Sequence, residues 1–112
     1  MDIDIKPGSF PNSINMNSHG TIPVAILSSS TFNAPDQVDK TSLTFGRTGN
    51  ENSLAFCTRS AEDVNADGLL DQVCHFNTQQ TRFQSGDTVG VLKAKTVTGT
   101  LMQDTDSVNI VP

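Results

Sequence analysis

Oxygen-bearing side chains recur at every second position of one short segment in the middle of the chain. Asp63, Asn65 and Asp67 occupy its first, third and fifth positions, Gly68 its sixth and Asp71 its ninth. Ca²⁺ takes about six to eight oxygen ligands, and alternating Asp and Asn side chains on a tightly turned backbone supply several of them. Glycine at the sixth position permits the turn that aims these groups at one point. The segment therefore predicts a calcium loop.

The remaining ligands follow from the same spacing. The main-chain carbonyl of Leu69 is expected to supply a fourth oxygen, and Asp71 a fifth, directly or through water. Ala66 stands where such loops often have glycine, so a positive φ there would cost about 1 kcal/mol. Leu70 is expected to tuck beneath the loop, and Glu62 either adds a ligand or balances charge. The predicted metal ligands are therefore Asp63, Asn65, Asp67, Leu69 and Asp71.

The flanks of the segment separate it from helical calcium loops. An EF-hand needs a bidentate Glu at its twelfth position, where this chain has Cys74. The residues Val73–Phe76 mix β-branched, aromatic and polar side chains as a strand does. The nine-residue form resembles the calcium loops between strands of integrin-type propeller repeats and those of thrombospondin type 3 repeats. The alternative is a turn rich in Asp, Asn and Gly that binds no ion, since these residues favour turns anyway.

Composition limits the class of partner. The 112 residues predict one domain, 1–112, and the net charge is −5, with twelve acidic residues against seven basic. This balance argues against a nucleic-acid partner, which needs a cationic face, and equally against anionic membranes. No apolar run approaches the roughly 20 residues that a membrane-spanning helix needs. The sequence carries no signal-peptide pattern, and we expect a module from a longer secreted or cell-surface protein.

Two cysteines flank the predicted calcium loop. If the strands on either side form a hairpin, Cys57 and Cys74 lie close together across it. A disulfide would staple the loop and imply an oxidising compartment, whereas two free thiols would act as small buried hydrophobes. Two cysteines do not decide between these alternatives by pattern alone.

Short β-rich runs separated by turn residues recur along the whole chain. Turn-bounded runs at this spacing predict a single antiparallel β-sandwich of seven to nine strands, Ig-like or jelly-roll in type. A short helical turn is expected in Ala34–Val38, and the apolar parity within Val89–Ala94 suggests a bulge. The expected strands are Asp2–Lys6, Thr21–Ser28, Ser42–Phe45, Ser53–Arg59, Gln72–Thr78, Thr88–Lys95, Thr98–Met102 and Ser107–Val111.

Blocks at the start of the chain carry a second resemblance. The segment Ile5–Asn15, IKPGSFPNSIN, is followed by Gly20–Leu27, and the block Glu62–Gly68, EDVNADG, lies further on. Together they resemble a module repeated in predicted secreted and surface proteins of bacteria and archaea. The resemblance covers nearly the whole chain. It implies an extracellular accessory domain and no particular activity.

Other chemistry receives less support from the sequence. His19 and His75 are the only histidines, and no nucleophile elbow is present, so we predict a non-enzymatic protein. Calcium-dependent carbohydrate binding is the alternative function, with polysaccharide or neighbouring domains as partners. The chain has no Trp or Tyr, and its six Phe are expected mostly in the core, with Phe10 and Phe83 the most exposed.

Several polar residues leave a second cation site open. Asn12 and Asn15 either satisfy local turn groups or join a second site with Asp2 or Asp4. A final pair, Asp104 and Asp106, is expected to form a solvated edge that discourages strand addition, with a second calcium site as the alternative.

Overall fold

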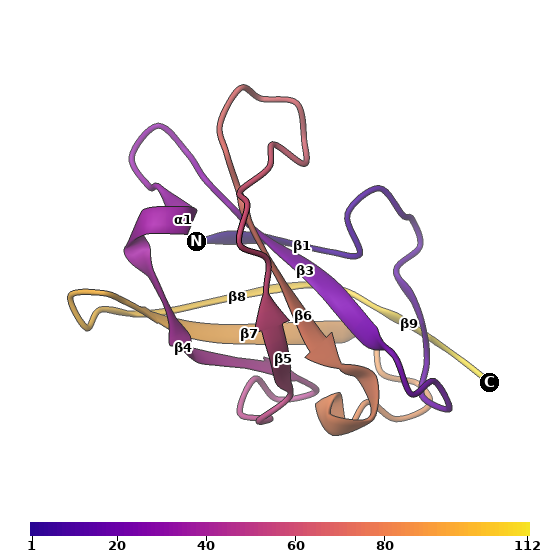
Figure 1. Ribbon diagram of the computed structural model, residues 1–112. Helices are drawn as coiled ribbons and strands as arrows, with labels where there is room; N and C mark the ends of the chain where they lie inside the picture. Colours follow the sequence, from indigo (N-terminus) through magenta and orange to yellow (C-terminus); the bar gives the residue numbers. More distant parts are fainter.

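The computed structural model describes residues 1–112 as nine strands with one helical turn and one 3₁₀ turn (Figure 1). No helix has both the length and the apolar character needed to cross a lipid bilayer. The elements are β1 Asp2–Ile5, β2 Ser13–Asn15, β3 Thr21–Leu27, α1 Ala34–Gln37, β4 Val38–Gly46, β5 Leu54–Cys57, β6 Gln72–Asn77, η1 Thr78–Thr81, β7 Val89–Thr96, β8 Leu101–Ser107 and β9 Asn109–Val111.

Two antiparallel sheets pack against each other, so the predicted all-β sandwich is confirmed. One sheet has the strand order β1-β3-β6-β5 and the other β4-β7-β8, while β2 and β9 form a separate parallel pair. Alternate residues of each strand face the space between the sheets, as the period of two requires. Strand β3 is central and nearly all apolar, as its sequence predicts, because its neighbours β1 and β6 cover both of its edges.

The core between the sheets is centred on three phenylalanines. Phe45 of β4 packs 5.0 Å from Phe76 of β6 and 5.9 Å from Phe83, measured between ring centroids. All three are buried, and burial of each such side chain contributes about 1.5–3 kcal/mol. Gly90 of β7 lies against this cluster, where an added Cβ would come within 2.9 Å of Ile5. The prediction that Phe83 is exposed is therefore wrong.

The open edge of β1 is closed by side chains of β8. Asp104 Oδ2 accepts a hydrogen bond from the N–H of Ile3, and Asp106 Oδ2 accepts one from Ile5, both at 2.9 Å. The buried Asn12 adds a donor to Asp106 and another to the carbonyl of Ser107. These aspartates were expected on a solvated edge, and Asn12 in a local turn. Both expectations are wrong, because the side chains make contacts between segments about a hundred residues apart.

Two details of strand placement also differ from expectation. The predicted final strand Ser107–Val111 is divided into the end of β8 and the short β9. Strand β7 pairs with β8 without interruption, so the bulge predicted within Val89–Ala94 is absent. The irregularity lies instead in β4, between Asp39 and Thr44.

Candidate metal site

The Asp63–Asp71 segment forms the connection between β5 and β6 and projects beyond the end of the sheet (Figure 1). Both flanks are strands, as expected for a loop that is not an EF-hand. Glu62 and Asp71 pair through their backbones at the base of the loop, with N–O distances of 3.2 and 2.8 Å. Below them, a disulfide joins Cys57 of β5 to Cys74 of β6. This disulfide decides the alternative left open by the sequence and indicates an oxidising compartment.

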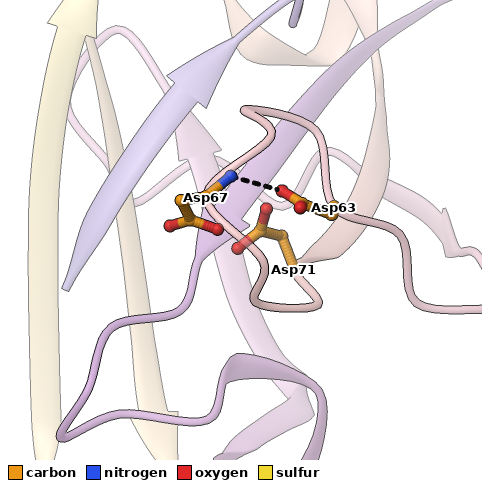
Figure 2. Close-up of side chains that lie close together, drawn as sticks. All are labelled: Asp63, Asp67 and Asp71. Atoms are coloured by element: carbon orange, nitrogen blue, oxygen red, sulfur yellow. Dashed lines mark hydrogen bonds between the residues drawn. The ribbon is translucent and has the colours of Figure 1, made fainter.

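Three carboxylates converge inside the loop. One oxygen from each of Asp63, Asp67 and Asp71 lies within 4.8 Å of the others, an arrangement that can hold a metal ion (Figure 2). Asp63 and Asp67 are accessible to solvent, whereas Asp71 is completely buried. The structure thus brings together residues one, five and nine of the predicted ligand set.

Asp71 is also the residue that attaches the loop to the rest of the sheet. Its Oδ1 accepts a hydrogen bond from the N–H of Ser28 at 2.7 Å, and its Oδ2 accepts one from Val64 at 3.1 Å. The hydroxyl of Ser28 donates to the carbonyl of Leu70 at 2.7 Å and accepts from the N–H of Ala34. Ser28 follows the end of β3, so one residue links the metal loop, the central strand and α1. Sequence reasoning missed Ser28, because nothing in a serine 43 positions away marks it as a partner.

Asp63 is held by the backbone of the same loop. The N–H of Gly68 donates to Oδ2 at 2.8 Å and that of Asp67 to Oδ1 at 3.2 Å. The hydrogen bond from Gly68 is the strongest influence on this group, and with the other backbone donors it lowers the pKa of Asp63. Each oxygen keeps a second lone pair for a cation. The turn needs positive φ at Ala66 (59°) and Gly68 (86°), so the expected strain at Ala66 is present.

Asn65 completes the group of side chains around the loop. With its amide oxygen turned inward, that oxygen lies 3.0 Å from Asp63 Oδ1 and 3.0 Å from Asp67 Oδ1. With the amide reversed, its NH₂ group donates to both carboxylates instead. The first orientation suits a loop with a bound cation, because it adds an oxygen ligand. The second suits a loop without a cation, because the NH₂ group then donates to the carboxylates.

The other residues singled out in this segment have different roles. Leu69 donates its N–H to Asp67 Oδ1 at 2.9 Å, and the ligand role of its carbonyl stays a prediction. Leu70 is 58 % exposed, so the prediction that it tucks beneath the loop is wrong. Glu62 contributes its backbone to the base of the loop, and its side chain is not in the carboxylate group.

Comparison of the chain with protein-family models, with curated proteins and with solved structures finds no match.

Proposed function

We propose that this chain is a non-catalytic structural module of a secreted or cell-surface protein, in which one Ca²⁺ rigidifies the β5–β6 loop. The observation that carries the proposal is the convergence of three carboxylates at one point. Asp63, Asn65, Asp67 and Asp71 would bind the ion through side chains and Leu69 through its carbonyl. The calcium-dependent carbohydrate-binding module remains the second candidate function.

The spacing of these oxygens supports a cation. Oxygens bound to one Ca²⁺ at about 2.4 Å lie roughly 2.8–3.4 Å from their nearest neighbours and up to about 4.8 Å apart across the ion. The three carboxylates offer oxygens within 4.8 Å of one another, and the Asn65 amide, with its oxygen turned inward, would add an oxygen 3.0 Å from one of Asp63 and from one of Asp67. Without a cation, inward oxygens at such distances repel one another.

The chemistry of the donors favours calcium over the other common ions. All five predicted ligands are oxygens, which suit Ca²⁺ or Mg²⁺, while Zn²⁺ prefers nitrogen and sulfur. Both cysteines are in the disulfide and cannot act as thiolates. Mg²⁺ usually keeps several waters and takes one or two carboxylates, whereas this loop offers three. The disulfide supports a location outside the reducing cytosol. Calcium is plentiful outside the cell.

The expected benefit is stability. Extracellular calcium sites have dissociation constants of about 10⁻⁴–10⁻³ M, and a hundredfold excess of calcium would add about 2.7 kcal/mol to the free energy of unfolding. For a domain of this size the corresponding rise in melting temperature is about 10 °C.

Thermal unfolding in CaCl₂ and in EGTA tests the proposal. The wild type should melt about 10 °C higher in calcium, with a smaller rise in MgCl₂, and Asp67→Asn should lose most of the difference. Asp39→Asn, which removes a half-buried acidic residue outside the metal loop that accepts only from Thr41, is the matched control and should keep the difference. A calcium-induced rise below about 2 °C in the wild type would count decisively against a structural ion.

A further inference from the structure

A hollow of about 410 Å³ lies on the outer face of the β1-β3-β6-β5 sheet, beside the metal loop. Its floor contains Pro23 of β3 with Val73 and His75 of β6. One wall is the β1–β2 connection at Pro7 and Gly8, and the opposite wall is Glu62–Val64. Figure 1 shows the metal loop rising from the start of β6 and the β1–β2 connection to its right. The hollow therefore depends on the loop for one of its walls.

A pair of stacked rings adjoins this hollow. Phe56 of the edge strand β5 is the cross-strand partner of His75, and the two rings lie 4.6 Å apart with planes inclined by 13°. Although strand phenylalanines were expected in the core, Phe56 is 53 % exposed. His75 covers one face of the Phe56 ring, and the hydroxyl of Thr21 lies 3.3 Å from the imidazole Nδ1. The sheet thus presents an ordered aromatic surface to solvent.

The charge of the lining limits the class of ligand. Glu62 and Asp63 are its only charged residues, and no Lys or Arg lines the hollow. The carboxylates of Glu62 and Asp63 would repel phosphate, sulfate or uronic-acid groups, and no cationic side chain would attract them. An anionic ligand is therefore disfavoured. Only two of the nine lining residues are hydrophobic, which disfavours a purely apolar anchor.

We propose that this hollow and the adjoining Phe56 ring bind a neutral oligosaccharide segment. A sugar ring has an apolar C–H face that can stack on an aromatic face, and hydroxyls that hydrogen-bond to polar groups. Thr58, Glu62 and the imidazole of His75 supply donors and acceptors beside the rings. Sites for small ligands commonly have volumes of about 300–1,000 Å³, and the volume of this hollow falls in that range.

The inference assigns a site and a ligand class to the second candidate function, and it rests on the structural ion only through the Glu62–Val64 wall. The sugar need not touch the ion. Calcium is therefore expected to strengthen sugar binding by holding the wall in place, while the contacts themselves come from the sheet face.

Isothermal titration with six-unit oligomers of cellulose, xylan, mannan, chitin and starch tests the inference, in both CaCl₂ and EGTA. At least one oligomer should bind the wild type, and Phe56→Ala should weaken that binding by about tenfold, equivalent to about 1.4 kcal/mol. Phe10→Ala is the matched control, since Phe10 is 89 % exposed and does not line the hollow. Its affinity should equal that of the wild type. Far-ultraviolet circular dichroism checks the fold of each variant.

A second variant keeps the test decisive if Phe56→Ala does not fold. The chain has no Trp, so Phe56→Trp places a single fluorophore in the stack. Its emission should change on titration with the oligomer that binds. Silence of all five oligomers, unchanged affinity in Phe56→Ala, or binding confined to polygalacturonate or a proline-rich peptide would overturn the inference. Sugar binding without a calcium effect on melting would contradict only the structural ion, and the reverse result would contradict only the sugar site.

Discussion

Asp71 differs from the other carboxylates of the site because it is buried and serves two purposes. Its two oxygens accept the N–H groups of Ser28 and Val64, so it supports the loop whether or not an ion is bound. Asp67 is accessible to solvent, and its backbone donor is the N–H of the nearby Leu69. Removal of charge should therefore affect these two positions differently.

Asp71→Asn should destabilise the domain even without calcium. The amide can accept one of the two N–H groups, but its NH₂ then faces the other donor, which leaves a buried group unsatisfied at a cost of about 1–3 kcal/mol. Asp67→Asn should remain within about 0.5 kcal/mol of the wild type in EGTA. Urea unfolding in EGTA measures both. Equal stability of Asp71→Asn and wild type would show that the two N–H groups do not depend on this carboxylate.

Ala66 is a position where the loop carries backbone strain. Its φ of 59° is unfavourable for alanine, so Ala66→Gly should raise the free energy of unfolding by up to about 1 kcal/mol. Ala61, in the same connection but without positive φ, is the matched control, and Ala61→Gly should lower it by about 0.5 kcal/mol. Thermal unfolding of both variants in calcium makes the comparison. The same sign of change in both variants would refute the role given to strain.

The carboxyl of Asp4 gives the fold a dependence on pH. Burial, and then the nearby charge of Asp106, raise its pKa above the ordinary value of 3.8. Because the folded state holds this proton more tightly than the unfolded chain, ionised Asp4 lowers stability at neutral pH, and this loss disappears as pH falls toward 3.8. Asp4→Asn should therefore melt higher than the wild type at pH 7, with a difference that shrinks on acidification.

Melting curves between pH 7 and pH 3.8 follow this difference. Asp2→Asn, at an exposed position of the same strand, controls for the overall loss of one negative charge. A difference that grows as pH falls would reverse the sign and contradict the prediction.

At the scale of elements, two links at the base of the metal loop hold the β5 and β6 strands together. The backbone pair of Glu62 and Asp71 closes the loop, and the Cys57–Cys74 disulfide joins the strands beneath it. Together they limit the conformations of the loop before an ion binds, so the loop loses less conformational entropy on binding.

Cys57→Ala with Cys74→Ala should lower the free energy of unfolding by about 3 kcal/mol, as expected for a cross-link that closes a loop of this length. Calcium affinity should fall as well, because the loop loses the disulfide that joins the strands beneath it. Urea unfolding and calcium titration measure the two effects. Unchanged calcium affinity in a folded double variant would show that the backbone pair alone organises the site.

Closure of β1 by β8 is the other feature at this scale. Asp104→Leu should leave the N–H of Ile3 without its partner and lower stability by about 1–3 kcal/mol. The freed strand edge should also favour association between molecules. Sedimentation at increasing protein concentration tests this second effect. Thr105→Leu, at an outward-facing position of the same strand, is the control and should remain as soluble as the wild type.

At the scale of the whole molecule, local pattern predicted the sandwich and the centre of the site. The period of two in Ile3 and Ile5, the apolar run of β3, and the spacing of Asp63, Asn65 and Asp67 depend on neighbouring residues alone. These properties are set before the chain folds, so sequence reveals them.

The remaining features depend on which segments meet. Whether Phe56 or Phe83 is buried depends on the sheet that covers each ring, and β5 proves to be an edge strand. Ser28 hydrogen-bonds to Asp71, and Asn12 hydrogen-bonds to Asp106. These partners are far apart in sequence, so no local pattern of residues predicts that they meet. Leu70 is exposed, and the hydroxyl of Ser28, from a segment 42 residues earlier, donates to its carbonyl.

The joining of β1 to β8 has a consequence for the order in which the protein is made. The N–H groups of Ile3 and Ile5 meet partners 101 residues later in the chain. Strand β1 is therefore among the last strands of this domain to be secured, and until β8 emerges the nascent domain has an unpaired edge at β1. A chaperone that binds extended segments would find its target there.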